Sequence, residues 1–150
     1  MKKLSLIIAF VLASSAGYAQ DAYIELLRSD VKTKKVAIIT EVMHFTNEET
    51  NAFWPVYREY DLELSKIGDG RLQLIKDYAQ NYETMTDEKA KELVDRALRL
   101  EAKRTKLKKK YFKKFDKVLP SKTAAKFFQL ENQINLLIDL QIASELPLIK

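Results

Sequence analysis

Almost everywhere after Asp21, the apolar residues of this chain recur every three to four positions, which is the spacing of one face of an α-helix. The longest such segment runs from Asp87 to about Val118 without a glycine or proline. At 1.5 Å per residue it would be about 48 Å long. No segment alternates apolar and polar residues in the way of a strand with one buried face. The pattern therefore predicts an all-α fold.

We expect four helices joined by short loops. The helical segments cover 24–42, Thr46 to Tyr78, 87–118, and Ser121 to a stop at Pro147. The second segment contains Pro55 and Gly68-Asp69-Gly70, which weaken a helix, so we expect it to be bent or interrupted. The length of the third segment favours an elongated, hairpin-type four-helix bundle.

Three helix starts are marked by an apolar residue shortly before a capping residue. The Thr46 hydroxyl can accept from the backbone N–H of Glu49, and the Glu49 carboxylate can accept from that of Thr46, which makes a full capping box. Thr86 caps the next helix in the same way, but Lys89 cannot reciprocate. After Leu119-Pro120, Ser121 is expected to take the capping role. Capping explains these residues without a ligand.

The last helical segment has a wider apolar face than the others. Its apolar residues are Phe127, Leu130, Ile134, Leu136, Leu137, Ile138, Leu140 and Ile142. Such a width indicates contact with more than one neighbour, so we expect a homodimer.

Residues 1–19 have the pattern of a secretory signal peptide. Lys2 and Lys3 precede an apolar run over 4–13, and small residues end at Ala19, where we expect cleavage. No later stretch reaches the roughly 20 apolar residues of a membrane-spanning helix. Residues 20–150 are expected to form a single domain in the periplasm. Without cysteine, this domain has no disulfide, thiolate or lipid-anchored cysteine.

Positive charge is concentrated in one part of the chain. Removing Lys2 and Lys3 lowers the formal net charge from +5 to +3. The segment 103–126 has a single acidic residue, Asp116. Its basic residues are Lys103, Arg104, Lys106, Lys108, Lys109, Lys110, Lys113, Lys114, Lys117, Lys122 and Lys126. Such a run is either a solvated helix face or a surface for acidic partners.

Apolar residues interleave with these lysines, and this favours a binding surface. The residues that we expect to contact a partner are Lys103, Lys106, Lys110, Lys113, Lys117 and Phe112. Export argues against nucleic acid as the partner, whereas weak contact with an anionic membrane surface stays an alternative.

The sequence contains no arrangement typical of an enzyme or a metal site. His44 is the only histidine, and a tight zinc site needs three or four ligands, so we interpret His44 as a loop residue. No Ser/His/Asp set or phosphate-binding glycine loop is present. We expect neither catalysis nor a cofactor. An aromatic string, Phe53, Trp54, Tyr57 and Tyr60, is either a peptide-binding stripe or core, and its helical spacing favours core.

The helix-start element resembles the motif of the LTxxQ-motif periplasmic family, which includes the Spy and CpxP stress proteins. The sequences Phe45-Thr46-Asn47-Glu48-Glu49 and Met85-Thr86-Asp87-Glu88-Lys89 keep the threonine, with Glu49 and Lys89 in place of the glutamine. Leu119-Pro120 lacks the threonine. The resemblance implies a curved helical-hairpin dimer and, for Spy-like members, ATP-independent chaperoning on a basic and apolar face.

Other segments resemble a branch of this family that includes proteins described as sensors associated with extracytoplasmic-function sigma factors. They are Phe53-Trp54-Pro55-Val56-Tyr57, Leu119-Pro120-Ser121-Lys122 and Phe127-Phe128-Gln129-Leu130-Glu131-Asn132. The expected function is thus the binding of unfolded or misfolded proteins. The alternative is a periplasmic sensor or adaptor that docks on the periplasmic part of a membrane signalling protein and modulates an envelope-stress or sigma-factor response. A bundle whose charges only keep it in solution is the third interpretation.

Overall fold

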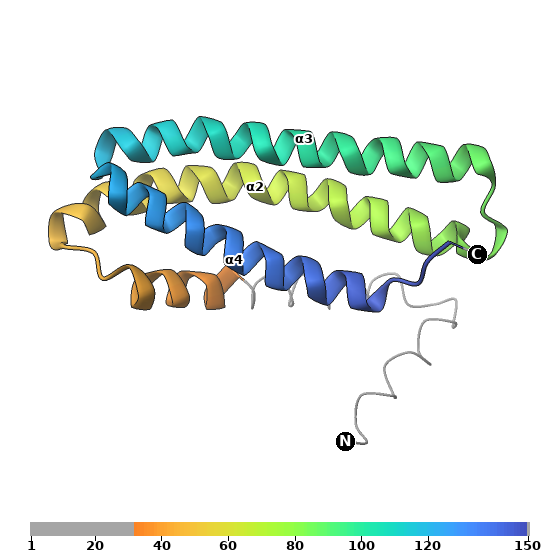
Figure 1. Ribbon diagram of the computed structural model, residues 1–150, viewed down its shortest axis with the longest axis horizontal. Coiled ribbons are helices and arrows are strands. Elements are labelled where there is room, and N and C mark those ends of the chain that lie inside the picture. The colour runs from red at the N-terminus through yellow and green to blue at the C-terminus, as the bar shows by residue number, and fades with distance from the viewer. Residues whose placement is uncertain (1–31, 150) are drawn as a thin grey trace, which may run out of the picture. The chain divides into compact units, whose positions relative to one another are not determined.

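The all-α fold is confirmed by a computed structural model, which describes residues 32–149 (Figure 1). Within this range there are four α-helices, one 3-10 turn and no strand. The first helix covers 32–43. It is followed by α2 (Asn47–Asn81), the turn η2 (Tyr82–Thr84), α3 (Asp87–Val118) and α4 (Ser121–Glu145). The described residues fall into two compact units that divide between Val42 and Met43.

The predicted signal peptide and the first part of the predicted 24–42 helix lie outside the described residues. No helix within 32–149 is both long and apolar enough to cross a membrane. The cleavage after Ala19 and the single domain over 20–150 stay predictions.

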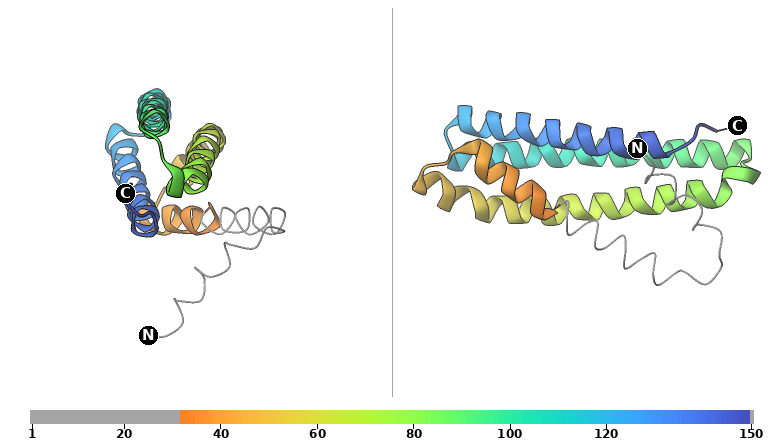
Figure 2. Two further views of the ribbon diagram at one scale, coloured as in Figure 1. Left: turned by 90° about the vertical axis from the view of Figure 1, so that its right-hand side faces the viewer. Right: turned by 90° about the horizontal axis from the view of Figure 1, so that it is seen from below.

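In the unit from Met43 onward, α2, α3 and α4 lie side by side. Seen end-on, they occupy the corners of a triangle (Figure 2). The helix α3 runs antiparallel to both neighbours, so Phe115 near its end meets Phe53 near the start of α2 and Phe127 near the start of α4. This arrangement places one long face of α3 away from both other helices.

The sequence predicts a bent or interrupted helix at Pro55 and at Gly68 to Gly70. Because α2 is one continuous helix, the predicted interruption is wrong, whereas the bend stays a prediction. Phe53, Tyr57 and Tyr60 are buried on both sides of Pro55, and this packing outweighs the loss of one backbone hydrogen bond. At Gly70 a Cβ atom would lie 2.8 Å from Leu100 Cδ2. A larger residue at this position would therefore displace the end of the Leu100 side chain.

Two of the three predicted caps are confirmed. The Thr46 hydroxyl accepts from the Glu49 N–H at 3.1 Å, and Glu49 Oε2 accepts from the Thr46 N–H at 3.0 Å. The Thr86 hydroxyl accepts from the Lys89 N–H at 3.2 Å.

The predicted capping role of Ser121 is wrong, because Pro120 is the N-cap residue and α4 begins at Ser121 itself. The extended backbone of Pro120, with ψ of 135°, ends the loop, and no side chain caps α4. The Glu49 carboxylate joins the starts of α2 and α4, since it accepts a hydrogen bond from the Thr123 hydroxyl at 2.9 Å.

The buried core is concentrated where α2 and α4 begin and α3 ends, and we name this part the aromatic end. Its buried residues are Phe53, Tyr57, Tyr60, Leu107, Tyr111, Phe115, Leu119, Ala124, Phe127, Leu130, Glu131 and Ile134. Glu131 is fully buried, and its Oε1 accepts from the Tyr60 hydroxyl at 3.0 Å and from Asn135 Nδ2 at 3.1 Å. Burial, and then the charge of Glu131, raises the pKa of Tyr60 well above its usual range.

The opposite part of the bundle is joined by charged groups, and we name it the ion-pair end. Asp139 of α4 pairs with Arg71 of α2 and with Arg104 of α3, the latter at 2.9 Å. Asp77 of α2 pairs with Arg96 of α3 and, at 2.9 Å, with Lys89 Nζ.

Two tyrosines join the C-terminal segment to this end. The hydroxyl of Tyr78 donates to the carbonyl of Pro147, and that of Tyr82 donates to the carbonyl of Leu148. Leu136, Leu137 and Leu140, which widen the apolar face of α4, are each about two-thirds exposed. The ion-pair end is therefore held mainly by polar contacts.

Candidate functional site

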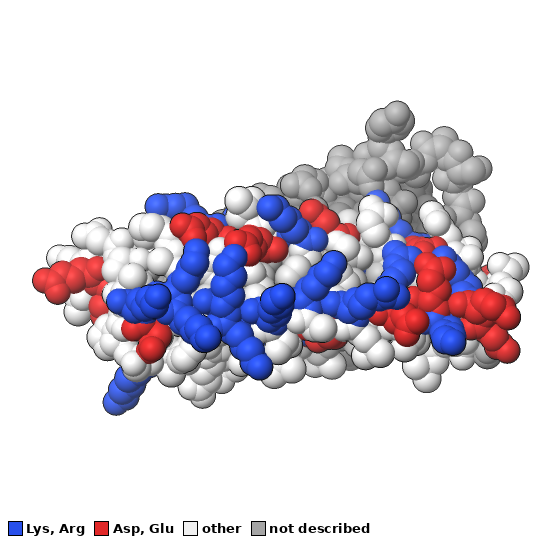
Figure 3. All heavy atoms as spheres, turned by 90° about the horizontal axis from the view of Figure 1, so that it is seen from above, with Lys and Arg blue, Asp and Glu red and all other residues white. Residues whose placement is uncertain are grey.

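Five lysines project from the face of α3 that is turned away from α2 and α4, and we name them the lysine stripe. They are Lys103, Lys106, Lys109, Lys113 and Lys117. Their steps of three and four residues place them along one side of the helix. All five are exposed, and none forms an ion pair with another residue of the described chain. Figure 3 shows basic side chains gathered along this face, with acidic ones at the end where α3 begins.

Lys110, a predicted site residue, lies beside the stripe and is turned toward α2. Its Nζ donates to both carboxylate oxygens of Glu63, at 2.9 and 3.0 Å, and lies 5.2 Å from the centre of the Tyr111 ring. Lys114 pairs with Glu59 at 2.6 Å in the same way. Burial and the hydrogen bond to Glu63 raise the pKa of Tyr111 to about 12. These lysines join α3 to α2 and are less available to a partner than the stripe.

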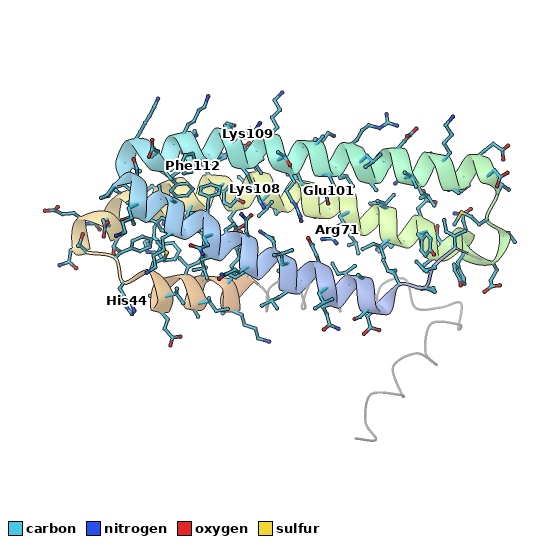
Figure 4. The ribbon with its side chains drawn as sticks, in the orientation of Figure 1. His44, Arg71, Glu101, Lys108, Lys109 and Phe112 are labelled. Atoms are coloured by element: carbon cyan, nitrogen blue, oxygen red, sulfur yellow. The ribbon has the colours of Figure 1, made fainter. Side chains whose placement is uncertain are left out.

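Phe112 lies on the other side of the stripe, toward α4. Its ring is 38% exposed and meets the Phe128 ring edge to face, with 5.5 Å between the ring centres. Figure 4 shows Phe112 and Lys108 on the side of α3 that faces α4. Here the surface forms a shallow hollow of about 380 Å³, which is lined by Lys108, Lys109, Phe112, Lys113, Phe128 and Asn132.

Of the predicted partner-binding residues, the structure brings Lys103, Lys106, Lys113 and Lys117 together on the stripe and places Phe112 beside it. Sequence reasoning missed Lys109, which belongs to the stripe, and Lys108, Phe128 and Asn132, which line the hollow. The spacing from Lys106 through Lys109 to Lys113 could have identified Lys109. The part contributed by α4 depends on how the two helices are paired, which is not a local property of the sequence.

The aromatic string of α2 belongs to the core, as predicted. Phe53, Tyr57 and Tyr60 are at most 2% exposed. Trp54 is half-buried, and its ring meets Phe53 and Tyr57 edge to face, with ring centres 5.0 and 5.3 Å apart. The string is therefore not an open stripe for a peptide.

His44 lies in the loop before α2, as predicted from the sequence. It is exposed and has a positive φ of 50°, which histidine tolerates better than most residues. Over the described part of the chain, no group of three or more histidine, aspartate or glutamate side chains is placed to hold a metal ion.

The chain was compared with protein-family models, with curated protein sequences and with solved structures, and none of them matches it. The resemblance to the Spy and CpxP proteins therefore stays a prediction, and a functional argument must start from the geometry of α3 and α4. That geometry offers exposed cations and a partly exposed aromatic surface side by side.

Proposed function

We propose that this protein is an exported, stress-related binding protein that holds unfolded or misfolded polypeptides without nucleotide. The observation that carries the proposal is the lysine stripe with the Phe112 ring beside it. The stripe attracts acidic segments at a distance, over about 8 Å at physiological ionic strength. The aromatic surface then contacts apolar groups that a folded client would bury.

The mode of binding follows from this composition. Exposed ammonium groups contribute little each, because water and salt screen them, and Phe112 offers only a small apolar area. A client is therefore held by several weak contacts and is released without an energy source. This is the behaviour required of a chaperone that acts without ATP.

The test is the aggregation of a chemically denatured enzyme, followed by light scattering with and without the purified protein. We expect suppression at stoichiometric amounts, and loss of suppression in a Lys106→Glu, Lys109→Glu, Lys113→Glu variant. The matched control reverses three exposed lysines elsewhere, Lys34→Glu, Lys66→Glu and Lys91→Glu, so that the net charge is the same. Absence of suppression by the unaltered protein would contradict the proposal.

The division of charge along α3 favours a second candidate, a sensor or adaptor that docks on a signalling protein. Acidic groups gather where α3 begins and basic groups along the rest of its outer face (Figure 3). A partner with the complementary division would bind in one orientation, which a general chaperone does not need. An envelope-stress or sigma-factor response that is unchanged after deletion of the gene would argue against this candidate.

A homodimer is part of the proposal, and exposed leucines on α4 support it. Leu136, Leu137 and Leu140 are about two-thirds exposed and lie on neighbouring positions of one face. Sedimentation of the protein should show a dimer that Leu137→Glu dissociates. The same change at Leu98, which is 62% exposed on α3, should leave the dimer intact.

A further inference from the structure

The hollow between α3 and α4 differs from the rest of the basic surface because its floor is preformed. Phe112 contacts Phe128, and Phe128 in turn packs against Phe115 and Phe127, with ring centres 5.8 and 5.2 Å apart. Phe115 and Phe127 are fully buried. The floor is thus an extension of the core, and it loses little side-chain freedom when a ligand binds.

Every charged residue that lines the hollow is a lysine. Lys108 is held in place by a hydrogen bond from its Nζ to Asn132 Oδ1 at 2.7 Å. Burial, and then repulsion from Arg104, lowers the pKa of Lys108. A carboxylate placed beside Lys108 would reverse part of this effect, because it favours the charged form of the amine. Lys109 and Lys113 are exposed at the rim.

The size of the hollow limits what it can hold. At about 380 Å³ it is near the lower end of ligand pockets in proteins, and it is open to solvent. It suits one large apolar side chain together with the acidic groups that flank it in a peptide. We propose that the hollow binds a phenylalanine or similar side chain of an acidic, unfolded segment, with flanking carboxylates on Lys108, Lys109 and Lys113.

This inference rests on the proposed function, and it names the kind of segment that the surface selects. The geometry favours a peptide over a membrane. The ring of Phe112 meets that of Phe128 of α4 edge to face and is 38% exposed, whereas a residue that inserts into a bilayer presents most of its side chain. The apolar floor is shallow and is formed by residues of two helices, so a single side chain can lie against it.

The test uses fluorescence anisotropy with short labelled peptides. One peptide has a central phenylalanine between aspartates and glutamates, and a second has serine in place of phenylalanine. We expect the first to bind about tenfold more tightly, because the hollow is shallow and this is the lower end of the effect of one methylene group in an apolar pocket. Equal affinities for the two peptides would overturn the inference.

Two variants with the same change of charge distinguish the contribution of the hollow to peptide binding from that of the rest of the lysine stripe. Lys109→Ala removes an exposed lysine from the rim, and Lys103→Ala removes an exposed lysine outside the hollow. We expect Lys109→Ala to lower the affinity for the phenylalanine peptide about fivefold. Lys103→Ala should change this affinity by less than about twofold. Equal losses would show general attraction only and would overturn the inference.

Two further results distinguish this inference from its alternatives. If the unaltered protein suppresses aggregation but does not discriminate between the peptides, the hollow is not the selective site, although the proposed function stands. The protein is also tested with vesicles of mixed anionic and neutral phospholipid. If the unaltered protein binds these vesicles, the Lys109→Ala variant does not, and neither peptide binds, the surface recognises membranes and the inference is overturned. Circular dichroism of both variants should match that of the unaltered protein, since both lysines are exposed.

Discussion

The aromatic end and the ion-pair end of the α2, α3 and α4 bundle are stabilised by different interactions. At the aromatic end, Phe127 of α4 lies within 6.4 Å, between ring centres, of Phe53, Tyr60 and Phe115 from the other two helices. At the ion-pair end, Asp139 joins the same three helices through two arginines. The first kind of contact removes apolar surface from water, whereas the second exchanges hydration for partly exposed ion pairs.

This difference between buried rings and ion pairs indicates where a binding surface can form in a small bundle. The hollow and most of the lysine stripe lie on α3 and α4 over the aromatic end, where the buried rings hold both helices in place. Lys103 is next to Arg104, which belongs to the ion-pair end. A binding surface with many lysines repels itself, so it needs support from packing that does not depend on charge. The ion-pair end has less such support, since its buried apolar residue in the described part of the chain is Leu93.

The largest loss of stability is expected when a buried ring of the aromatic end is removed. Phe127→Ala removes a fully buried ring that contacts five other rings, and it should lower the free energy of unfolding by about 3–5 kcal/mol. Leu98→Ala, at a site 62% exposed toward the ion-pair end, should change it by less than about 0.5 kcal/mol. Urea denaturation measures both. Similar losses at the two sites would contradict the placement of Phe127 in a packed core.

The next effect concerns the buried carboxylate. Tyr60→Phe keeps the ring but removes the hydroxyl that donates to Glu131 Oε1. We expect a loss of about 1–3 kcal/mol in the free energy of unfolding, because the fully buried Glu131 side chain loses a hydrogen bond. The control is Tyr78→Phe, whose hydroxyl donates to the Pro147 carbonyl in an exposed position, and it should leave global stability unchanged. An unchanged Tyr60→Phe variant would show that Glu131 does not depend on this bond.

A smaller loss of stability is expected when a helix cap in the aromatic end is removed while the core packing is kept. Thr46→Ala removes the side-chain part of the capping box of α2 and should destabilise the protein by about 1 kcal/mol. Ser121→Ala should have no measurable effect, because the Ser121 side chain does not cap α4. Thermal unfolding of the two variants provides the comparison. Equal losses would mean that Ser121 caps α4 in solution.

The smallest expected effect is a local response of the ion-pair end to acid. Hydrogen bonds from Arg104 and Arg71 outweigh the effect of burial and hold the pKa of Asp139 below its ordinary value of 3.8. Hydrogen bonds from Lys89 and Arg96 lower that of Asp77. Because folding lowers both pKa values, the stabilisation is complete above the unfolded value and is lost as the pH falls through the folded values.

Hydrogen exchange, corrected for the intrinsic rate at each pH, tests this response. Below about pH 4, amides of α2 near Asp77 should lose protection before those of α3 near Tyr111. Although the pKa of Glu63 is also lowered, by Lys110 and then Tyr111, the rings beneath it keep the aromatic end closed. Asp139→Asn should open the ion-pair end at neutral pH as well. Simultaneous loss of protection at both ends would contradict the comparison.

The local features of the sequence were sufficient to predict much of the fold. The start of α2 at Thr46 and the start of α3 after Thr86 depend on hydrogen bonds between residues three apart, so the sequence shows them directly. The bounds of α3 followed from an unbroken periodicity. The continuity of α2 could not be predicted in this way, because Pro55 and Gly70 weaken the helix locally and the packing of distant residues restores it.

The candidate site was predicted only in part, for a similar reason. Eight of the fifteen residues from Lys103 to Lys117 are lysines. Because successive residues of a helix are turned by about 100°, these lysines point to several sides of it. Some of these lysines contact other helices: Lys110 and Lys114 pair with Glu63 and Glu59 of α2, and Lys108 bonds to Asn132 of α4. Within the described residues, the lysine stripe has no such contact. None of the three partner residues on α2 and α4 is near the run in the sequence.

By itself, the sequence determined that the chain is helical, where α2 and α3 begin, and that one helix has a strong positive charge. Each of these properties depends on residues within about one turn of a helix. The tertiary structure alone decided that Lys109 is open while Lys110 is paired, that Glu131 is buried among aromatic rings, and that Phe112 and Phe128 form one floor. The physical reason is that burial and pairing depend on which faces of separate helices meet, and residues far apart in the chain control that.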